Sequence, residues 1–271
     1  MSDDAELRPE RRHRIRVHAV SNSDALGYLG QQAISAAVST EDDYRIVGGH
    51  MVRLLLEVYP TPQATPRSTL DADAAVGDVE VVGPLSERLR AQDFVKSGGN
   101  VFLKQAEGGQ QIEINLLLPR LDHAPGIRPR HIPGVGQVDS LPELHLVMQS
   151  DPLHLDVTAI LLDGQAIAYR TRIPDVESAV ILKAHAWNAR RTEKDVADLH
   201  SLLEIREAHP EVPWKLADSG LIGFKRDAAR ILHELAERVV RKNAGFPVPA
   251  HLDRKRMAGL VLRHVSQPRP R

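Results

Sequence analysis

Cysteine is absent from all 271 residues of the sequence. Its absence excludes disulfide bonds, zinc sites built from thiolates and cysteine nucleophiles. The sequence also lacks any apolar run that approaches the roughly 18 residues needed to cross a bilayer. The N-terminus is charged and has no apolar segment of the kind that signal peptides carry. We therefore expect a cytoplasmic protein that does not enter a membrane.

Several common catalytic motifs are missing as well. No P-loop, no G-x-G-x-x-G and no G-x-S-x-G occurs, which removes the signatures of P-loop enzymes, Rossmann-type enzymes and α/β-hydrolases. Thirteen histidines are present, but none forms the zinc-protease pattern of two histidines four residues apart around an acid. What is there is a composition of 42% hydrophobic and 26% charged residues, typical of a soluble globular protein.

The hydrophobic pattern divides the chain into three parts. Residues 1–15 indicate a charged lead-in, residues 16–174 mix helical and strand periodicity, and residues 175–271 are helical with a basic end. We therefore predict an α+β protein, in which a mixed sheet flanked by helices is followed by a C-terminal helical domain.

Local signals place the individual elements. Strands are expected over 44–47, 70–76, 100–105, 110–118, 154–162 and 166–173. Helices are expected over 25–39, 51–58, 84–92, 175–208, 216–243 and 252–265. Residues 119–138 contain four prolines and three glycines, and predict a long loop.

Two adjacent glycines, Gly48 and Gly49, end the strand over 44–47 and lead directly into a helix. Without a Cβ, the backbone there can approach a phosphate closely, and the helix N-terminus adds favourable partial charge. Taken alone, a Gly-Gly pair at the end of a strand is more often a plain turn.

Asp71 and Asp73 follow on the next strand, one residue apart. Alternate residues of a strand share a face, which puts their Cα atoms about 6.6 Å apart. Two ionised carboxylates on one face repel each other unless a cation lies between them. The pair therefore predicts a Mg²⁺ site that also holds the phosphates of a nucleotide. A surface strand with two solvated acids is the alternative.

Glu113 lies on the strand over 110–118, with Asn115 on the same face. If this strand lies beside the Asp71–Asp73 strand, Glu113 becomes a third acid that binds metal or accepts a proton from an attacking hydroxyl. The alternative is a strand residue that faces solvent.

A cationic stripe is expected on the helix over 175–208. At about 100° per residue, Lys183, Arg190 and Lys194 fall within about 40° of one another. Such a stripe suits a triphosphate or a nucleic acid. The alternative is a solvated helix face, on which Asp195 and Asp198 offset its cations.

The last 21 residues, 251–271, carry six Arg or Lys residues against the single acid Asp253. They are Arg254, Lys255, Arg256, Arg263, Arg269 and Arg271. This end of the chain either binds an anionic partner such as RNA or forms a solvated tail.

Together these motifs resemble a known family. The order is Gly48-Gly49, then Arg67-x-Thr69-x-Asp71-x-Asp73, then Lys183, Ala186, Arg190, Lys194, Asp195, Asp198 and Leu199. This pattern is similar to the AbiEii/AbiGii toxin family of nucleotidyltransferases, which includes the mycobacterial MenT toxins, over about residues 25–205. The resemblance implies a polymerase-beta-type nucleotidyltransferase fold, Mg²⁺ dependence and transfer of a nucleotide from an NTP. In the MenT relatives the acceptor is the 3′ end of tRNA, and a cognate antitoxin neutralises the toxin.

The resemblance also implies residue roles. Asp71, Asp73 and Glu113 would bind metal and, with Lys183, act in catalysis. The nucleotide would be bound by Gly48, Gly49, His50, Arg67, Thr69, Lys183, Arg190, Lys194, Asp195 and Asp198. Two positions depart from the family pattern: His50 follows the glycines where a small hydroxyl residue is common, and Glu113 stands where Asp is usual. Two alternatives remain open, a nucleotidyltransferase that acts on a small molecule or protein, and a catalytically silent nucleotide-binding module.

Overall fold

The computed structural model describes residues 12–122 and 126–268. Within these residues, ten strands form two sheets. In chain order the strands are β1 Arg12–His18, β2 Tyr44–Ile46, β3 Ala72–Val76, β4 Val95–Gly98, β5 Val101–Gln105, β6 Gln111–Pro119, β7 Arg128–Ile132, β8 Gly136–Leu141, β9 Leu153–Ile160 and β10 Ala166–Ile173. The helices are α1 Asn22–Ala37, α2 Gly48–Val58, α3 Val79–Arg90, α4 Glu143–Gln149, α5 Val176–Arg190, α6 Glu193–Ala208, α7 Gly223–Val239 and α8 Arg254–His264, with a short 3-10 turn at Glu107–Gly109.

The seven-stranded sheet carries the candidate acids. Its strands follow the order β2-β3-β6-β5-β4, while β8 pairs with the end of β6 and β7 pairs with β8. β3 and β6 run parallel, and their register places Asp73 beside Asn115. Helix α1 covers one face of this sheet, where Gly30 lies close to Ala72 and Ile112. Because side chains alternate between faces, Asp73 and Asn115 point to the opposite face.

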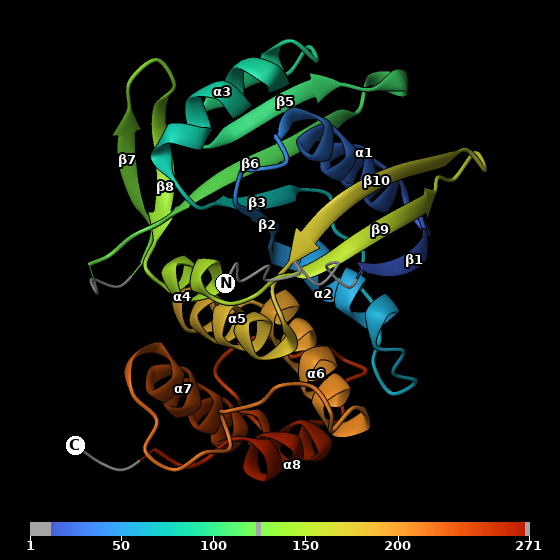
Figure 1. Cartoon of the computed structure of the whole chain (residues 1–271). Helices are drawn as coiled ribbons and strands as arrows, with labels where there is room; N and C mark the ends of the chain where they lie inside the picture. Colours follow the sequence, from blue (N-terminus) through green and yellow to red (C-terminus); the bar gives the residue numbers. More distant parts are fainter. Residues whose placement is uncertain (1–11, 123–125, 269–271) are drawn as a thin grey trace, which may run out of the picture.

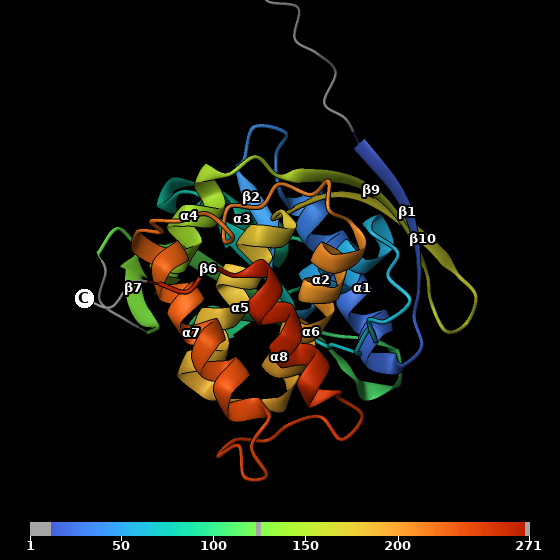
Figure 2. The ribbon, with the colours of Figure 1, turned by 90° about the horizontal axis from the view of Figure 1, so that it is seen from below.

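The three-stranded sheet has the order β1-β9-β10. Helices α1 and α2 pack against one face of it, through β10 and β1 respectively. Figure 2 shows the three strands along the outer side of these helices. The burial of every second residue in β9 and β10 agrees with this arrangement, since only one face of the sheet is covered.

Helices α5 to α8 form the C-terminal part and lie together on one side of the sheets (Figure 1). The α+β class expected from the sequence is therefore confirmed: mixed sheets with their helices come first, and helices follow. No helix in the described ranges is long and apolar enough to cross a bilayer.

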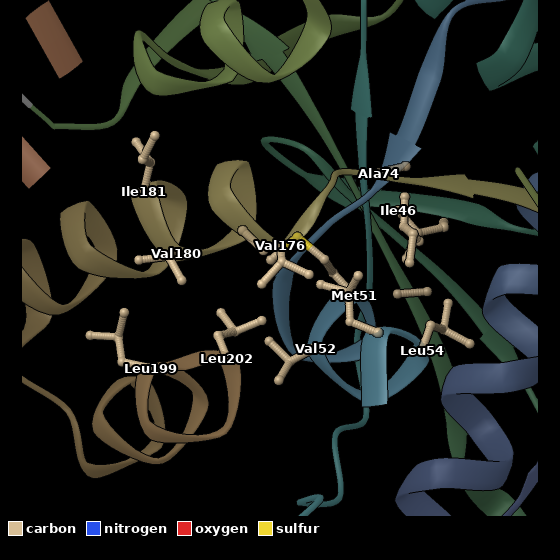
Figure 3. Close-up of a cluster of buried hydrophobic side chains, with 14 of the residues drawn as sticks. Ile46, Met51, Val52, Leu54, Ala74, Val176, Val180, Ile181, Leu199 and Leu202 are labelled. Atoms are coloured by element: carbon tan, nitrogen blue, oxygen red, sulfur yellow. The ribbon is translucent and has the colours of Figure 1, made fainter. Parts of the chain in front are cut away.

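One hydrophobic core crosses the boundary expected at residue 174. Its N-terminal contribution includes Ile46, Met51 and Leu54, and its helical contribution includes Val180 of α5 and Leu202 of α6 (Figure 3). Since these side chains are buried together, α5 is held firmly against the elements that carry the two glycines and the two acids. This packing positions the candidate site.

Several expected elements differ from the structure. The helix expected over 175–208 is two helices, because Arg191 adopts a left-handed conformation with φ of 52° and Thr192 caps α6 by accepting from the Asp195 backbone N–H. The loop expected over 119–138 contains the antiparallel hairpin of β7 and β8. Strand β4 and helix α4 were not expected.

The N-terminal lead-in needs a further correction. Residues 12–15, expected to belong to it, are part of β1 and pair with β9. Residues 1–11 lie outside the described part of the chain, as do Arg269 and Arg271 of the basic end.

Candidate functional site

A cavity of about 320 Å³ lies between the seven-stranded sheet and helices α4 and α5. It brings together residues that are more than 100 positions apart in the sequence. Among the predicted site residues, the cavity is lined by Gly48, Asp71, Asp73, Lys183 and Arg190. The double glycine, the acidic strand and the basic helix therefore meet in one place.

Gly48 is the point of closest approach between α2 and the acidic strand. Its φ is +69°, and a Cβ added there would lie 2.0 Å from Oδ2 of Asp73. The two segments are also joined by a hydrogen bond of 2.9 Å from the Val47 N–H to the Asp73 carbonyl. Only glycine satisfies both the conformation and the space.

The N-terminus of α2 has no side-chain cap, because its N-cap residue is Val47. The first backbone N–H groups of a helix have no partner within it, and the helix dipole adds partial positive charge there. Gly48, the first residue of α2, lines the cavity. This end of α2 is therefore suited to an anion such as a phosphate.

Gly49 has a different role from Gly48. A Cβ at Gly49 would lie 2.7 Å from both Nη2 of Arg67 and Oγ1 of Thr69. Thr69 is itself buried, and its hydroxyl donates to Asp71 Oδ1 at 3.4 Å. Arg67 and Thr69 thus pack behind the double glycine and steady the acidic strand, and neither lines the cavity.

The two aspartates repel each other in the absence of a cation. Burial raises the pKa of Asp73 to about 7, and the neighbouring charge of Asp71 adds to the rise. The Asn115 amide donates to Asp73 Oδ1 at 3.0 Å and opposes it in part, together with the charges of Lys183 and Arg190. A cation bound between the carboxylates would remove the remaining cost of ionising both.

Asn115, rather than Glu113, is the residue beside Asp73. The Asn115 amide also donates to Glu113 Oε1 at 3.3 Å, so Glu113 stands one step further from the acidic pair. Asn115 lines the cavity, and Glu113 is not among its lining residues. Within the described ranges, no group of three or more histidines and acids is placed to hold a metal ion. The structure thus brings Asp71, Asp73 and Asn115 together, with Glu113 adjacent.

Lys183 belongs to a buried network. Its Nζ lies 2.6 Å from Asp198 Oδ2, and the Arg67 guanidinium makes two further bonds to the same carboxylate, of 2.7 and 2.8 Å. Lys183 and Asp198 are 4% and 1% exposed. One acid therefore serves two cations, which leaves positive charge at the cavity wall.

Arg190 is the last residue of α5 and also lines the cavity. It donates to the Asp195 carboxylate at 2.7 Å, and Asp195 in turn accepts from the Thr192 hydroxyl at 2.6 Å. The break between α5 and α6 sends Lys194 elsewhere: its side chain is exposed and does not line the cavity. The prediction that Lys194 shares one helix face with Lys183 and Arg190 assumed a continuous helix, and it is therefore wrong.

The structure does not bring His50 to the cavity. Its side chain is 0% exposed and lies behind the double glycine, next to Gly27 and the Tyr28 ring. Burial lowers the pKa of His50 to about 4, so the ring is neutral. His50 is a packing residue of α2 in this arrangement, and its burial does not support the nucleotide contact expected from the sequence.

Besides Asn115, four polar residues of the cavity wall were not among the predicted site residues: Asn100, Asp139, Glu143 and His185. Glu143 and His185 form a pair, with 3.2 Å between Oε1 and Nδ1. Burial raises the pKa of Glu143, but the bonds from His185 and from its own backbone outweigh this and hold the pKa below its usual value. Asp139 was not predicted because strand β8 begins within residues 119–138, where the prolines and glycines of the hairpin give the same signal as a loop.

Comparison with known proteins assigns the chain to no family. No family model matches it, and no curated protein matches it. Among solved structures, the chain is similar to an antigenic nucleotidyltransferase-like protein from Paracoccidioides brasiliensis, with 16% sequence identity and a TM-score of 0.42. The match covers 77% of this chain and 87% of that chain. At this identity and score, the likeness gives this chain neither an activity nor a substrate.

Proposed function

We propose that the cavity binds a nucleoside triphosphate with Mg²⁺ and transfers its nucleotide to an RNA acceptor. One observation supports this most strongly. The N-terminus of α2 at Gly48, the Asp71–Asp73 pair, and the cations Lys183 and Arg190 converge on one cavity, although they come from distant parts of the chain. Two carboxylates, a helix N-terminus and two cations are the groups that hold a metal-bound triphosphate.

The residues present fit Mg²⁺. Asp71, Asp73 and Asn115 offer oxygen ligands, which this cation prefers, and a bound cation would offset the burial and the neighbouring charge of Asp71 that raise the pKa of Asp73. Mg²⁺ bound there would neutralise charge on the triphosphate. Glu113 is kept as a proposed third metal ligand, because the Asn115 amide that contacts Asp73 also donates to Glu113.

The chain's own groups have separate tasks in this proposal. The α2 N-terminus orients the phosphates, and the lack of a Cβ at Gly48 leaves room beside Asp73. Lys183 and Arg190 stabilise the negative charge that builds up on the leaving pyrophosphate. The proton of the attacking hydroxyl would be accepted by Glu113 or by a metal-bound group. Arg67, Thr69, Asp195 and Asp198 hold these groups in position.

The acceptor and the biological role rest on the family resemblance. By that resemblance the acceptor is the 3′ end of tRNA, the protein is the toxin of a toxin-antitoxin pair, and a cognate antitoxin is its partner. Transfer to a small molecule or a protein is the second candidate, since the same cavity would serve it. A silent nucleotide-binding module is the third.

A labelling assay tests the proposal. With Mg²⁺ and an α-³²P-labelled NTP, the protein should label tRNA, and replacing both aspartates, Asp71→Ala with Asp73→Ala, should abolish the label. Gly48→Ala should also lower labelling by about 100-fold or more, because its Cβ would collide with Asp73.

The matched control is Gly259→Ala, within α8, where nothing lies within 4 Å of the added Cβ. It should label as the unmodified protein does. Undiminished labelling by the double aspartate variant would refute the assignment of the site, and label that appears only on small acceptors would favour the second candidate.

A further inference from the structure

The outer face of the three-stranded sheet is strongly basic. Register and alternation align Arg12, His154 and Arg172 in one row across β1, β9 and β10, and Arg14, Asp156 and Arg170 in the next. Arg16 continues the line along β1, beside Thr158. We call Arg12, Arg14, Arg16, Arg170 and Arg172 the arginine face; with Asp156 as its one acid, its formal charge is five minus one, or +4.

Part of this charge is engaged by the protein itself, since Arg172 donates to the carbonyls of Asp42 and Thr40 at 2.8 and 3.0 Å and lies over the Tyr44 ring. Asp156 lies 3.4 Å from Arg170 and 4.0 Å from Arg12. Arg14 and Arg16 are exposed, and no ion pair within 4.0 Å includes either of them in the described part of the chain. Their Cα atoms stand about 6.6 Å apart along one strand. Like charges so close on one face are unfavourable unless an anion covers them.

The basic C-terminal segment behaves differently. Arg256 makes a bidentate pair with Glu204, at 2.8 and 2.7 Å, and Arg263 pairs with Glu207. Arg254 donates to the carbonyls of Val239 and Arg241. Most of the described cations of that segment are therefore engaged within the protein: Arg256 and Arg263 connect α8 to α6, and Arg254 connects it to the end of α7. The segment is a weaker candidate for an anionic partner than the arginine face.

The strands hold the arginines on a firm base. The opposite face of the sheet is buried, with Val17, Val157 and Tyr169 at 0%, 2% and 7% exposure, against α1 and α2. Figure 2 shows this sheet on the outside of the molecule. Because the packed backbone fixes where the arginines leave the sheet, no backbone rearrangement is needed when they bind.

From this arrangement we propose that the arginine face binds the phosphate backbone of the RNA acceptor, which rests on the proposed function in that the acceptor is RNA. The chemistry of the face favours a polyanion over a protein. A protein interface has aromatic or apolar residues at its centre, whereas the centre of this face holds Arg14, Asp156 and Arg170. Guanidinium groups repeated along a strand match phosphates, which they bind through paired N–H donors.

Binding of a fluorescent tRNA transcript, measured by anisotropy without NTP, tests this proposal. The variant Arg14→Glu with Arg16→Glu should bind at least about tenfold more weakly at moderate salt, and the slope of log affinity against log salt should fall by roughly 1.4 to 1.8. The affinity of the milder variant, Arg14→Gln with Arg16→Gln, should lie between that of the unmodified protein and that of the Glu variant. This comparison separates the loss of contacts from the repulsion that the glutamates add.

The control is Arg241→Glu with Lys242→Glu, the same charge change at two exposed residues after α7. It should bind tRNA within about twofold of the unmodified protein. Equal losses in the two charge-reversed variants would overturn the proposal, since net charge alone would then explain binding. Unchanged binding by the Arg14 and Arg16 variant would overturn it too, as would preferred binding of an acidic peptide or of phosphatidylserine vesicles over tRNA.

A second readout separates this proposal from the proposed function. Arg14 and Arg16 do not line the cavity, so their variant should keep any rise in melting temperature that Mg²⁺ and NTP produce. Failure of nucleotide binding in the unmodified protein would reject the proposed function and leave the RNA result standing. Loss of the nucleotide effect only in the arginine variant would show that the sheet had been disturbed, and would overturn the docking assignment.

Discussion

Asp73, a proposed metal ligand, lowers the stability of the folded protein when its carboxyl group is ionised. Its carboxylate is held beside Asp71, and its pKa is raised from 3.8 to about 7 by burial and by that neighbour. A carboxyl whose folded pKa exceeds its unfolded value destabilises the fold fully at pH values above the folded pKa. The penalty disappears as the pH falls through 7 toward 3.8.

This gives a prediction for Asp73→Asn. In EDTA at pH 8 the variant should be more stable than the unmodified protein, by on the order of 2 kcal/mol, because no ionised carboxylate is then buried beside Asp71. The difference should shrink as the pH is lowered toward 4, where the unmodified carboxyl is protonated. Urea denaturation at several pH values measures it. A variant that is less stable at pH 8 would contradict the electrostatic explanation. A difference in the free energy of unfolding that is the same at every pH would contradict it too.

At the residue scale the sequence was most informative where a strand pattern fixes the direction of side chains. Asp71 and Asp73 alternate with small apolar residues, which face α1, so their common face followed from spacing alone. His50 shows the limit. Its place after two glycines indicated a nucleotide contact, but a side chain in the first turn of a helix points either to the site or to the core, and local sequence does not distinguish the two.

Among the elements, α5 and α6 decide which cations reach the cavity. The apolar periodicity continues through residues 175–208 and predicts one unbroken helix. Thr192 and Asp195 mark the break, and their spacing is a helix-capping pattern that is visible in the sequence. Because of the break, Arg190 remains at the cavity and Lys194 does not.

Asp198 of α6 connects α5 and the segment before β3 through its ion pairs with Lys183 and Arg67. Replacing it in Asp198→Asn leaves Lys183, and the largely buried Arg67, without their acid. We expect a loss of about 3 kcal/mol in the free energy of unfolding, since each buried cation loses its compensating charge.

A control for this prediction is Asp93→Asn, whose carboxylate lies 3.8 Å from Lys104 and belongs to a side chain that is 88% exposed. Exposed ion pairs contribute about 1 kcal/mol or less, so this variant should change stability little. Urea denaturation compares the two. Equal small losses would mean that the Asp198 network does not hold the two parts of the chain together.

For the whole molecule, the sequence predicted the class and the order of the parts better than their contacts. Mixed strands and helices followed by helices were expected, and this is the observed α+β organisation. The cavity wall beyond the motifs was not expected: Asp139 lies on strand β8, which begins inside the segment expected to be a loop, and Glu143 begins a short helix. Such residues are brought to the site by tertiary packing, which leaves no local pattern in the sequence.

The central claim is that this cavity binds Mg²⁺ and a nucleoside triphosphate together, and the melting temperature tests it most directly. Each of the four NTPs is added at about 100 times its expected Kd, with and without Mg²⁺, to the unmodified protein and to Asp71→Asn with Asp73→Asn. At least one NTP with Mg²⁺ should stabilise the unmodified protein by about 2.7 kcal/mol, a rise of roughly 5 to 10 °C, and should leave the variant unchanged. No rise with any NTP, or an equal rise in the variant, would contradict the claim.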